Sequence, residues 1–143
     1  THKTSSAASD VYKRQVIDLG TATTFDVVSR NKEYLGGSLA PGIKISLDAL
    51  TLKTASLKSV ELDTPNKVIG KNTYEAIQSG LIMGHASMID SMVEKIILEI
   101  DIEPKIILTG GLSKVVQPIL NVNVEYKENL TLVGLEEIFK LNN

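Results

Sequence analysis

The chain has 143 residues, of which 43% are hydrophobic and 22% charged, a composition typical of one globular domain with an apolar core. The net charge of -2 and the lack of a basic stretch argue against a nucleic-acid partner. The chain holds no cysteine, which excludes disulfides and thiolate metal sites, and no apolar run approaches the roughly 18 residues needed to cross a bilayer, so we expect a cytoplasmic protein without a membrane partner.

Residues 1–15 differ from the rest of the chain. They contain one Val and one Tyr among Ser, Thr, Ala and Lys, with no apolar segment that would form a signal peptide. Such a composition buries too little apolar surface to offset the entropy lost on ordering. We therefore expect a disordered tail of unrelated origin, followed by a domain over residues 16–143.

Three strands are predicted after this tail. The first ends near Gly20, the second covers about 22–29 and is rich in β-branched and aromatic residues, and the third covers about 33–39. Asp26 interrupts the apolar pattern of the second strand. It is either a second site carboxylate or a strand-face carboxylate bonded to neighbouring backbone, and the second reading is favoured because polar groups within strands are usually satisfied locally.

The turn between the first two strands suits a loop that holds phosphate oxygens. Gly20 lets the main chain approach an anion closely, while consecutive backbone N–H groups and threonine hydroxyls such as that of Thr21 supply donors. A carboxylate beside phosphates requires a cation between them, which makes Asp18 a candidate metal or metal-water ligand. The alternative is an ordinary hairpin with a glycine turn and a solvated Asp.

Helices dominate the middle of the chain. A Pro-Gly break at residues 41–42 precedes a helix with Ile43, Leu47 and Leu50 on one face, and residues 52–68 read as an irregular connection able to cover the site. A long helix follows over about 72–99, with Asn72 as N-cap and Glu75 placed as in a capping box. Its predicted apolar stripe consists of Ile77, Leu81, Met88, Met92 and Ile96.

Three small or polar residues of this helix are open to more than one interpretation. Gly80 and Gly84 permit close packing against the sheet or against a second subunit. His85 is read as a packing or surface residue, because no second ligand stands at metal-binding spacing.

The last segment is predicted as strand, loop, strand and helix. The strands cover about 105–108 and 122–126, and the helix covers 132–141 with Leu135, Ile138 and Phe139 inward. Gly110 and Gly111 bring the backbone close to a flat or anionic group, or form a plain strand-to-helix turn. Three antiparallel strands followed by alternating helices and strands predict an α/β layered half-domain.

Four motifs, taken together with their spacing, resemble type III pantothenate kinases. They are DLGTATTFDVV at residues 18–28, GGSLAPGI at 36–43, GKNTYEAIQSG at 70–80 and TGG at 109–111. These kinases belong to the superfamily of acetate kinase, sugar kinases, heat-shock chaperones and actin. The resemblance implies an RNase H-like half-domain, as in actin-like ATPases, corresponding to the C-terminal half of such an enzyme.

The resemblance also implies a reaction, the ATP-dependent phosphorylation of pantothenate, which is the first step toward coenzyme A. Gly20 and Thr21 would then hold ATP phosphates, and Asp18 would help to bind a monovalent cation, potassium or ammonium, with magnesium a further candidate as the ATP counter-ion. Thr73, otherwise a first-turn helix residue with a local bond, would contact pantothenate. Gly110 and Gly111 would face adenosine, and the full-length protein would be a homodimer.

Two strings of the resembled family are absent from these residues. They are the first phosphate loop of the DxGNT type and the GADR-like segment whose Asp is the general base, so we nominate no catalytic residue and expect the chain alone to be inactive. Two alternatives stay open. One is a nucleotide-binding regulatory protein of the same family without turnover, and the other is a sugar kinase or polyphosphatase of the same superfamily.

Overall fold

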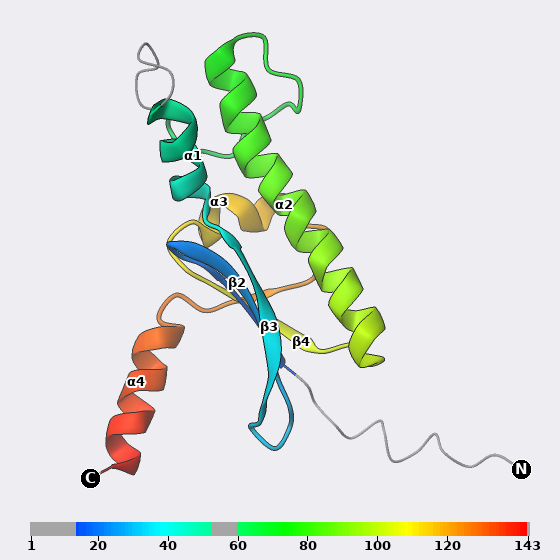
Figure 1. The fold of residues 1–143 in the computed structure, drawn as a ribbon, viewed down its shortest axis with the longest axis vertical. Coiled ribbons are helices and arrows are strands. Elements are labelled where there is room, and N and C mark those ends of the chain that lie inside the picture. Colours follow the sequence, from blue (N-terminus) through cyan, green and yellow to red (C-terminus); the bar gives the residue numbers. More distant parts are fainter. Residues whose placement is uncertain (1–13, 53–59, 143) are drawn as a thin grey trace, which may run out of the picture.

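The computed structural model describes residues 14–52 and 60–142 and shows an α/β fold with one mixed sheet of five strands (Figure 1). In chain order the elements are β1 (Arg14–Leu19), β2 (Ala22–Val28), β3 (Tyr34–Pro41), α1 (Ile43–Leu52), α2 (Thr73–Ile100), β4 (Lys105–Thr109), α3 (Ser113–Val116), a 3-10 turn (Gln117–Ile119), β5 (Glu125–Tyr126) and α4 (Leu130–Leu141). The predicted order of three strands followed by helices and strands is confirmed.

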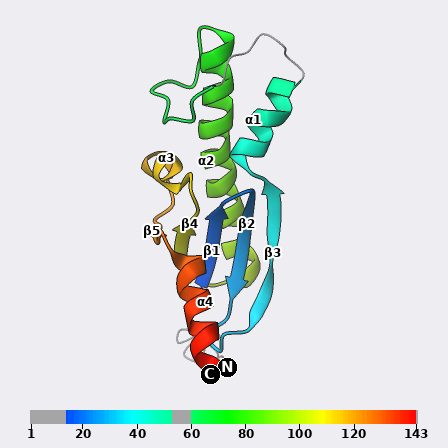
Figure 2. The ribbon, with the colours of Figure 1, turned by 90° about the vertical axis from the view of Figure 1, so that its left-hand side faces the viewer.

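The sheet order is β3-β2-β1-β4-β5. The first three strands form an antiparallel meander, while β4 runs parallel to β1 and β5 runs parallel to β4 (Figure 2). Buried and partly exposed residues alternate along β1 and β2, as expected for a sheet with one covered face. The covered face packs on α2, and the residues of this core include Ile17, Leu19, Phe25, Ile82, Ala86, Ile89, Val93 and Leu108.

The buried stripe of α2 differs from the predicted one. Ile82, Ala86, Ile89 and Val93 are buried, whereas the predicted residues Ile77, Leu81, Met88, Met92 and Ile96 are only partly buried and flank that stripe. Both sets recur at three- and four-residue intervals. Because apolar residues surround much of this helix, their spacing alone does not identify the side that meets the sheet.

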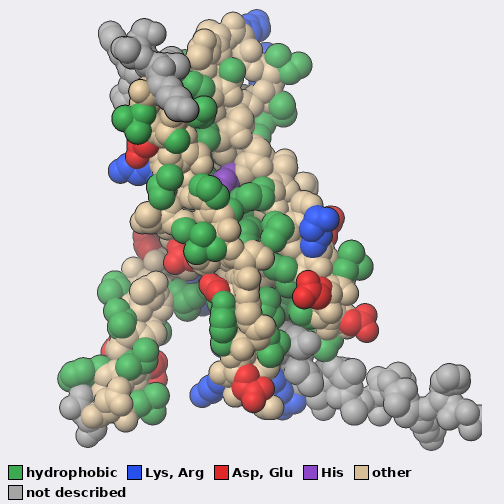
Figure 3. All heavy atoms as spheres, in the orientation of Figure 1, with side chains coloured by type: hydrophobic (Ala, Val, Ile, Leu, Met, Phe, Trp, Pro, Cys, Tyr) green, Lys and Arg blue, Asp and Glu red, His purple; other side chains and the backbone are tan. Residues whose placement is uncertain are grey.

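The predicted core face of α1 is partly right, and that of α4 is wrong. Ile43 and Leu47 of α1 are buried as predicted, but Leu50 is 47% exposed, since α1 extends past the end of the sheet (Figures 1 and 2). In α4 no residue is buried, so the inward assignment of Leu135 and Phe139, like that of Ile138, is wrong. Figure 3 shows apolar side chains exposed along this helix, which projects from the body.

The predicted strand over residues 122–126 is shorter than expected. Only Glu125 and Tyr126 join the sheet as β5. The backbone N–H groups of Asn121 and Val122 instead donate to the carboxylate of Asp90 on α2, at 3.0–3.1 Å. These bonds hold the segment against the helix and remove it from the ladder.

The start of the domain is also shifted. Strand β1 begins at Arg14, two residues before the predicted boundary, and Gln15 is fully buried. Residues 1–13 of the predicted tail and residues 53–59 of the predicted irregular connection lie outside the described residues. In the part of the chain that the structure describes, no helix is both long and apolar enough to span a membrane.

Candidate functional site

The candidate site is built around the turn between β1 and β2. Strand β1 ends at Leu19 and β2 begins at Ala22, so Gly20 and Thr21 make up the turn itself. Gly42, directly after β3, lies so close that an added Cβ would stand 2.1 Å from the carbonyl oxygen of Thr21. On the β4 side, a Cβ on Gly110 would stand 2.5 Å from the carbonyl carbon of Leu19. Two glycines that tolerate no side chain thus enclose the turn.

Gly110 has a second reason to be glycine. Its φ is +100°, a backbone conformation that L side chains rarely adopt. It directly follows Thr109, which pairs with Asp18 across β4 and β1. The neighbouring Gly111 has no non-neighbouring atom within 4 Å of a built Cβ. Of the two glycines predicted to face adenosine, one is therefore pressed against the turn and the other faces open space.

Asp18 lies beside both the turn and Gly110. Its Oδ1 atom is 3.2 Å from the Cβ position of Gly20 and 2.6 Å from that of Gly110. Burial, and next the charge of Asp26, raise the pKa of Asp18 above its usual 3.8. A cation beside this carboxylate would oppose both effects. The structure thus brings together Asp18, Gly20, Thr21 and Gly110, four of the six predicted site residues.

Asp26 lies two positions further along β2 than Thr24, the cross-strand partner of Asp18. Its Oδ1 accepts a hydrogen bond of 3.0 Å from the hydroxyl of Tyr34 on β3. The Asp26 carboxylate is thus bonded to a side chain of the adjacent strand. The sequence had suggested a bond to neighbouring backbone instead. Among the described residues, no group of three or more His, Asp or Glu side chains is arranged to hold a metal ion. A cation at Asp18 would need further oxygen ligands, such as those of phosphates.

Thr73 is exposed and lies apart from the turn. It is the first residue of α2, and its neighbour Asn72 is the predicted N-cap, whose Oδ1 accepts from the N–H of Glu75 at 2.8 Å. His85 contacts β2, and Thr73 lies twelve residues before it on the same helix. At roughly 1.5 Å per residue, this separation is about 18 Å along the helix axis. One copy of the chain therefore does not place Thr73 beside the β1–β2 turn.

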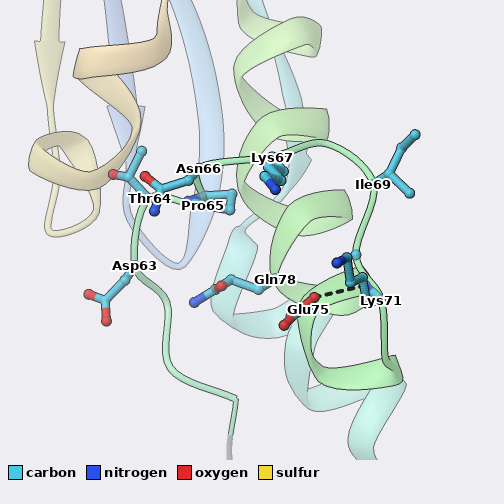
Figure 4. A pocket seen from close by; sticks show the side chains of 10 residues that line it. Asp63, Thr64, Pro65, Asn66, Lys67, Ile69, Lys71, Glu75 and Gln78 are labelled. Atoms are coloured by element: carbon cyan, nitrogen blue, oxygen red, sulfur yellow. Dashed lines mark hydrogen bonds between the residues drawn. The ribbon is translucent and has the colours of Figure 1, made fainter.

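A pocket of about 450 Å³ lies near the start of α2, and sequence reasoning missed it. It forms because the irregular segment before the helix folds back along it, with Gln78 Nε2 donating to the carbonyl of Glu61 at 2.9 Å. Figure 4 shows Gln78 and Glu75 pointing into the enclosed space, with Glu75 bonded to the N–H of Lys71 at 2.7 Å. Thr73 is not among the residues that line this pocket. No periodic pattern in the sequence indicates such a fold-back.

His85 makes a specific contact that the sequence did not reveal. Its Nε2 lies 2.7 Å from Oγ1 of Thr23, which is 1% exposed. Burial lowers the pKa of the imidazole below its usual 6.5. His85 was predicted as a packing or surface residue; it is partly buried in α2 and in addition makes a directional bond to the strand that leaves the turn.

Comparison with known proteins identifies the family. A family model described as type III pantothenate kinase matches residues 4–95. The chain is 44% identical over 127 residues to the type III pantothenate kinase of Anaeromyxobacter sp. (strain K), covering 89% of the chain and 50% of that protein. It is 45% identical over 138 residues to that of Syntrophus aciditrophicus (strain SB), covering 95% of the chain and 54% of that protein.

A solved structure agrees on the fold. The crystal structure of a Campylobacter jejuni protein described as a Baf family transcriptional activator superposes with a TM-score of 0.63 at 23% identity, covering 91% of this chain and 58% of that one.

The chain spans about half the length of the curated relatives it matches. The unrelated origin of residues 1–15 stays a prediction. From the family match and these relatives together, the chain belongs to the type III pantothenate kinase family.

Proposed function

We propose that the chain forms the nucleotide-binding, C-terminal half of a kinase that transfers the γ-phosphoryl group of ATP to the primary hydroxyl of pantothenate. The proposal rests on family membership and on one structural observation, the enclosure of the turn by Gly42 and Gly110. Side chains at these two positions would fill the space that the backbone occupies. Within this proposal the mixed sheet is an RNase H-like half-domain.

In the proposed reaction the turn binds and orients phosphate oxygens. The N–H groups of Gly20 and Thr21 and the threonine hydroxyl supply the donors, which suits a reaction that depends on positioning and on neutralising oxygen charge. Asp18 holds a monovalent cation, potassium or ammonium, against the phosphates, and this positive charge would oppose the burial and the Asp26 charge that raise the pKa of its carboxyl. ATP supplies the phosphoryl group, with magnesium as its counter-ion.

The remaining site residues follow the same proposal. Gly110 and Gly111 face the adenosine, with the open side of Gly111 able to admit a flat group. Thr73 contacts pantothenate at the exposed start of α2. No residue of the chain is assigned as the general base, so the chain alone does not turn over substrate. The full protein acts in the cytoplasm as a homodimer.

Nucleotide binding by the chain tests the proposal. An ADP titration followed by amide NMR is expected to shift the signals of Gly20, Thr21 and Gly110 most strongly, because the first two would contact the phosphates and Gly110 would face the adenosine. Asp18→Asn is expected to abolish the dependence of that affinity on potassium while leaving the chain folded. A folded chain whose turn signals do not move at saturating ADP would refute the assignment of the turn.

A further inference from the structure

One hydrogen bond joins α2 to the hairpin that carries the candidate phosphate turn. His85 Nε2 on α2 lies 2.7 Å from Thr23 Oγ1 on β2. Thr23 is 1% exposed and stands opposite Leu19, so it belongs to the residue pair that closes the turn. The helix behind the sheet therefore makes a polar contact at the base of the turn.

The ring of His85 is suited to a directional contact. Burial lowers its pKa, so the imidazole is neutral at neutral pH. A neutral imidazole has one donor and one acceptor nitrogen. In the part of the chain that the structure describes, Thr23 is its hydrogen-bond partner, and the adjacent Ala86 lies in the core.

Other contacts between α2 and this face of the sheet come from apolar residues such as Ile82 and Ile89 on the helix and Leu19 on the strand. Apolar burial has no preferred direction, whereas a hydrogen bond weakens steeply when its distance or angle changes. The 2.7 Å bond between His85 and Thr23 thus sets the position of α2 along the hairpin.

We propose that His85 is a positioning residue, which through Thr23 fixes the register of α2 against the β1–β2 turn and so keeps the turn in the shape that receives nucleotide phosphates. The inference rests on the proposed function of the turn and adds to it a residue 62 positions from Thr23 that touches no reacting atom.

The test compares ADP affinity, measured by calorimetry, with the free energy of unfolding, measured by urea titration. Thr23→Val keeps the side-chain shape and removes the hydroxyl, and His85→Leu removes the ring nitrogens; each is expected to weaken ADP binding about fivefold to tenfold, the effect of one neutral hydrogen bond. Thr23→Ser and His85→Gln retain a partner for the bond and are expected to stay within about twofold of the unaltered chain. Met88→Leu, on the same helix and outside this contact, serves as the control.

Three results would overturn the inference. If Thr23→Val and His85→Leu lose stability but bind ADP as tightly as the unaltered chain, the bond serves the fold alone. If the unaltered chain does not bind ADP, the proposed role of the turn is wrong. This result is distinct from one in which the turn binds ADP and only the positioning role of His85 is wrong. Where a variant is unfolded, NMR of the unaltered chain decides, because the ring nitrogen signals of His85 are expected to shift at saturating ADP and unchanged signals would contradict the proposal.

Discussion

Replacement of Gly110 by alanine tests the geometry of the site directly. The new Cβ would stand 2.5 Å from the carbonyl carbon of Leu19 and 2.6 Å from Oδ1 of Asp18, at a residue whose φ is +100°. The unfavourable φ costs about 1–3 kcal/mol, and overpacking against backbone costs about 1–3 kcal/mol more. The Asp18 carboxylate could rotate away, but the Leu19 atoms belong to the backbone of β1, so the end of β1 must shift.

We therefore expect Gly110→Ala to lower the free energy of unfolding by about 2–6 kcal/mol and to abolish ADP binding, since Asp18 and the turn are displaced together. Urea unfolding and calorimetry measure the two effects. Gly111→Ala is the matched control, because its Cβ meets no non-neighbouring atom within 4 Å and the expected change in stability is within about 0.5 kcal/mol. A Gly110→Ala chain that is as stable as the Gly111→Ala chain and binds ADP as tightly as the unaltered chain would refute the reasoning.

Three further predictions concern charged side chains. Asp90→Ala should lower the free energy of unfolding by about 2–4 kcal/mol, because the carboxylate accepts four hydrogen bonds from Asn121 and Val122; an unchanged urea midpoint would contradict this. The raised pKa of Asp18 means that its carboxyl binds a proton more tightly in the folded state than in the unfolded state. Without potassium, the free energy of unfolding measured by urea titration should therefore fall as pH rises above 3.8, and Asp18→Asn should remove this dependence on pH. Lys105 and Lys127 lower the pKa of Glu125 from 4.5 to about 2, so the stability that these ion pairs contribute is present above pH 4.5 and lost as the pH falls toward 2. A Glu125→Gln chain that loses as much stability over the same pH range would contradict this.

Local chemistry made the position of the β1–β2 turn predictable, while its role in binding phosphate stays a prediction. An acid, a glycine and threonines stand within a few positions of one another, and two strands flank them, so Asp18, Gly20 and Thr21 could be placed on one turn from the sequence. The enclosure by Gly42 and Gly110 was not predictable in the same way. It depends on β3 ending beside the turn and on β4 running parallel to β1, and both arrangements join residues far apart in the chain.

The errors in the core have a common physical cause. Periodicity indicates that a helix has an apolar side, but it does not indicate which other element covers that side. This is why the stripe of α2 was misplaced by one residue position and why Phe139 of α4, 69% exposed, was assigned inward. The hydrogen bonds that Asp90 accepts had no sequence signal, because their donors, two backbone N–H groups and the side-chain amide of Asn121, lie 31 and 32 residues away.

We propose that this chain supplies the phosphate-binding turn of a pantothenate kinase, and a complementation assay tests this role. The chain is mixed with the separately expressed N-terminal half of a relative, such as the Syntrophus aciditrophicus enzyme, and phosphorylation of pantothenate by ATP is measured with and without potassium. We predict turnover only in the complemented mixture containing potassium, and its loss on Asp18→Ala. Turnover by the chain alone would show that a general base lies within these residues, and a folded, ADP-binding complex without turnover would contradict the kinase assignment.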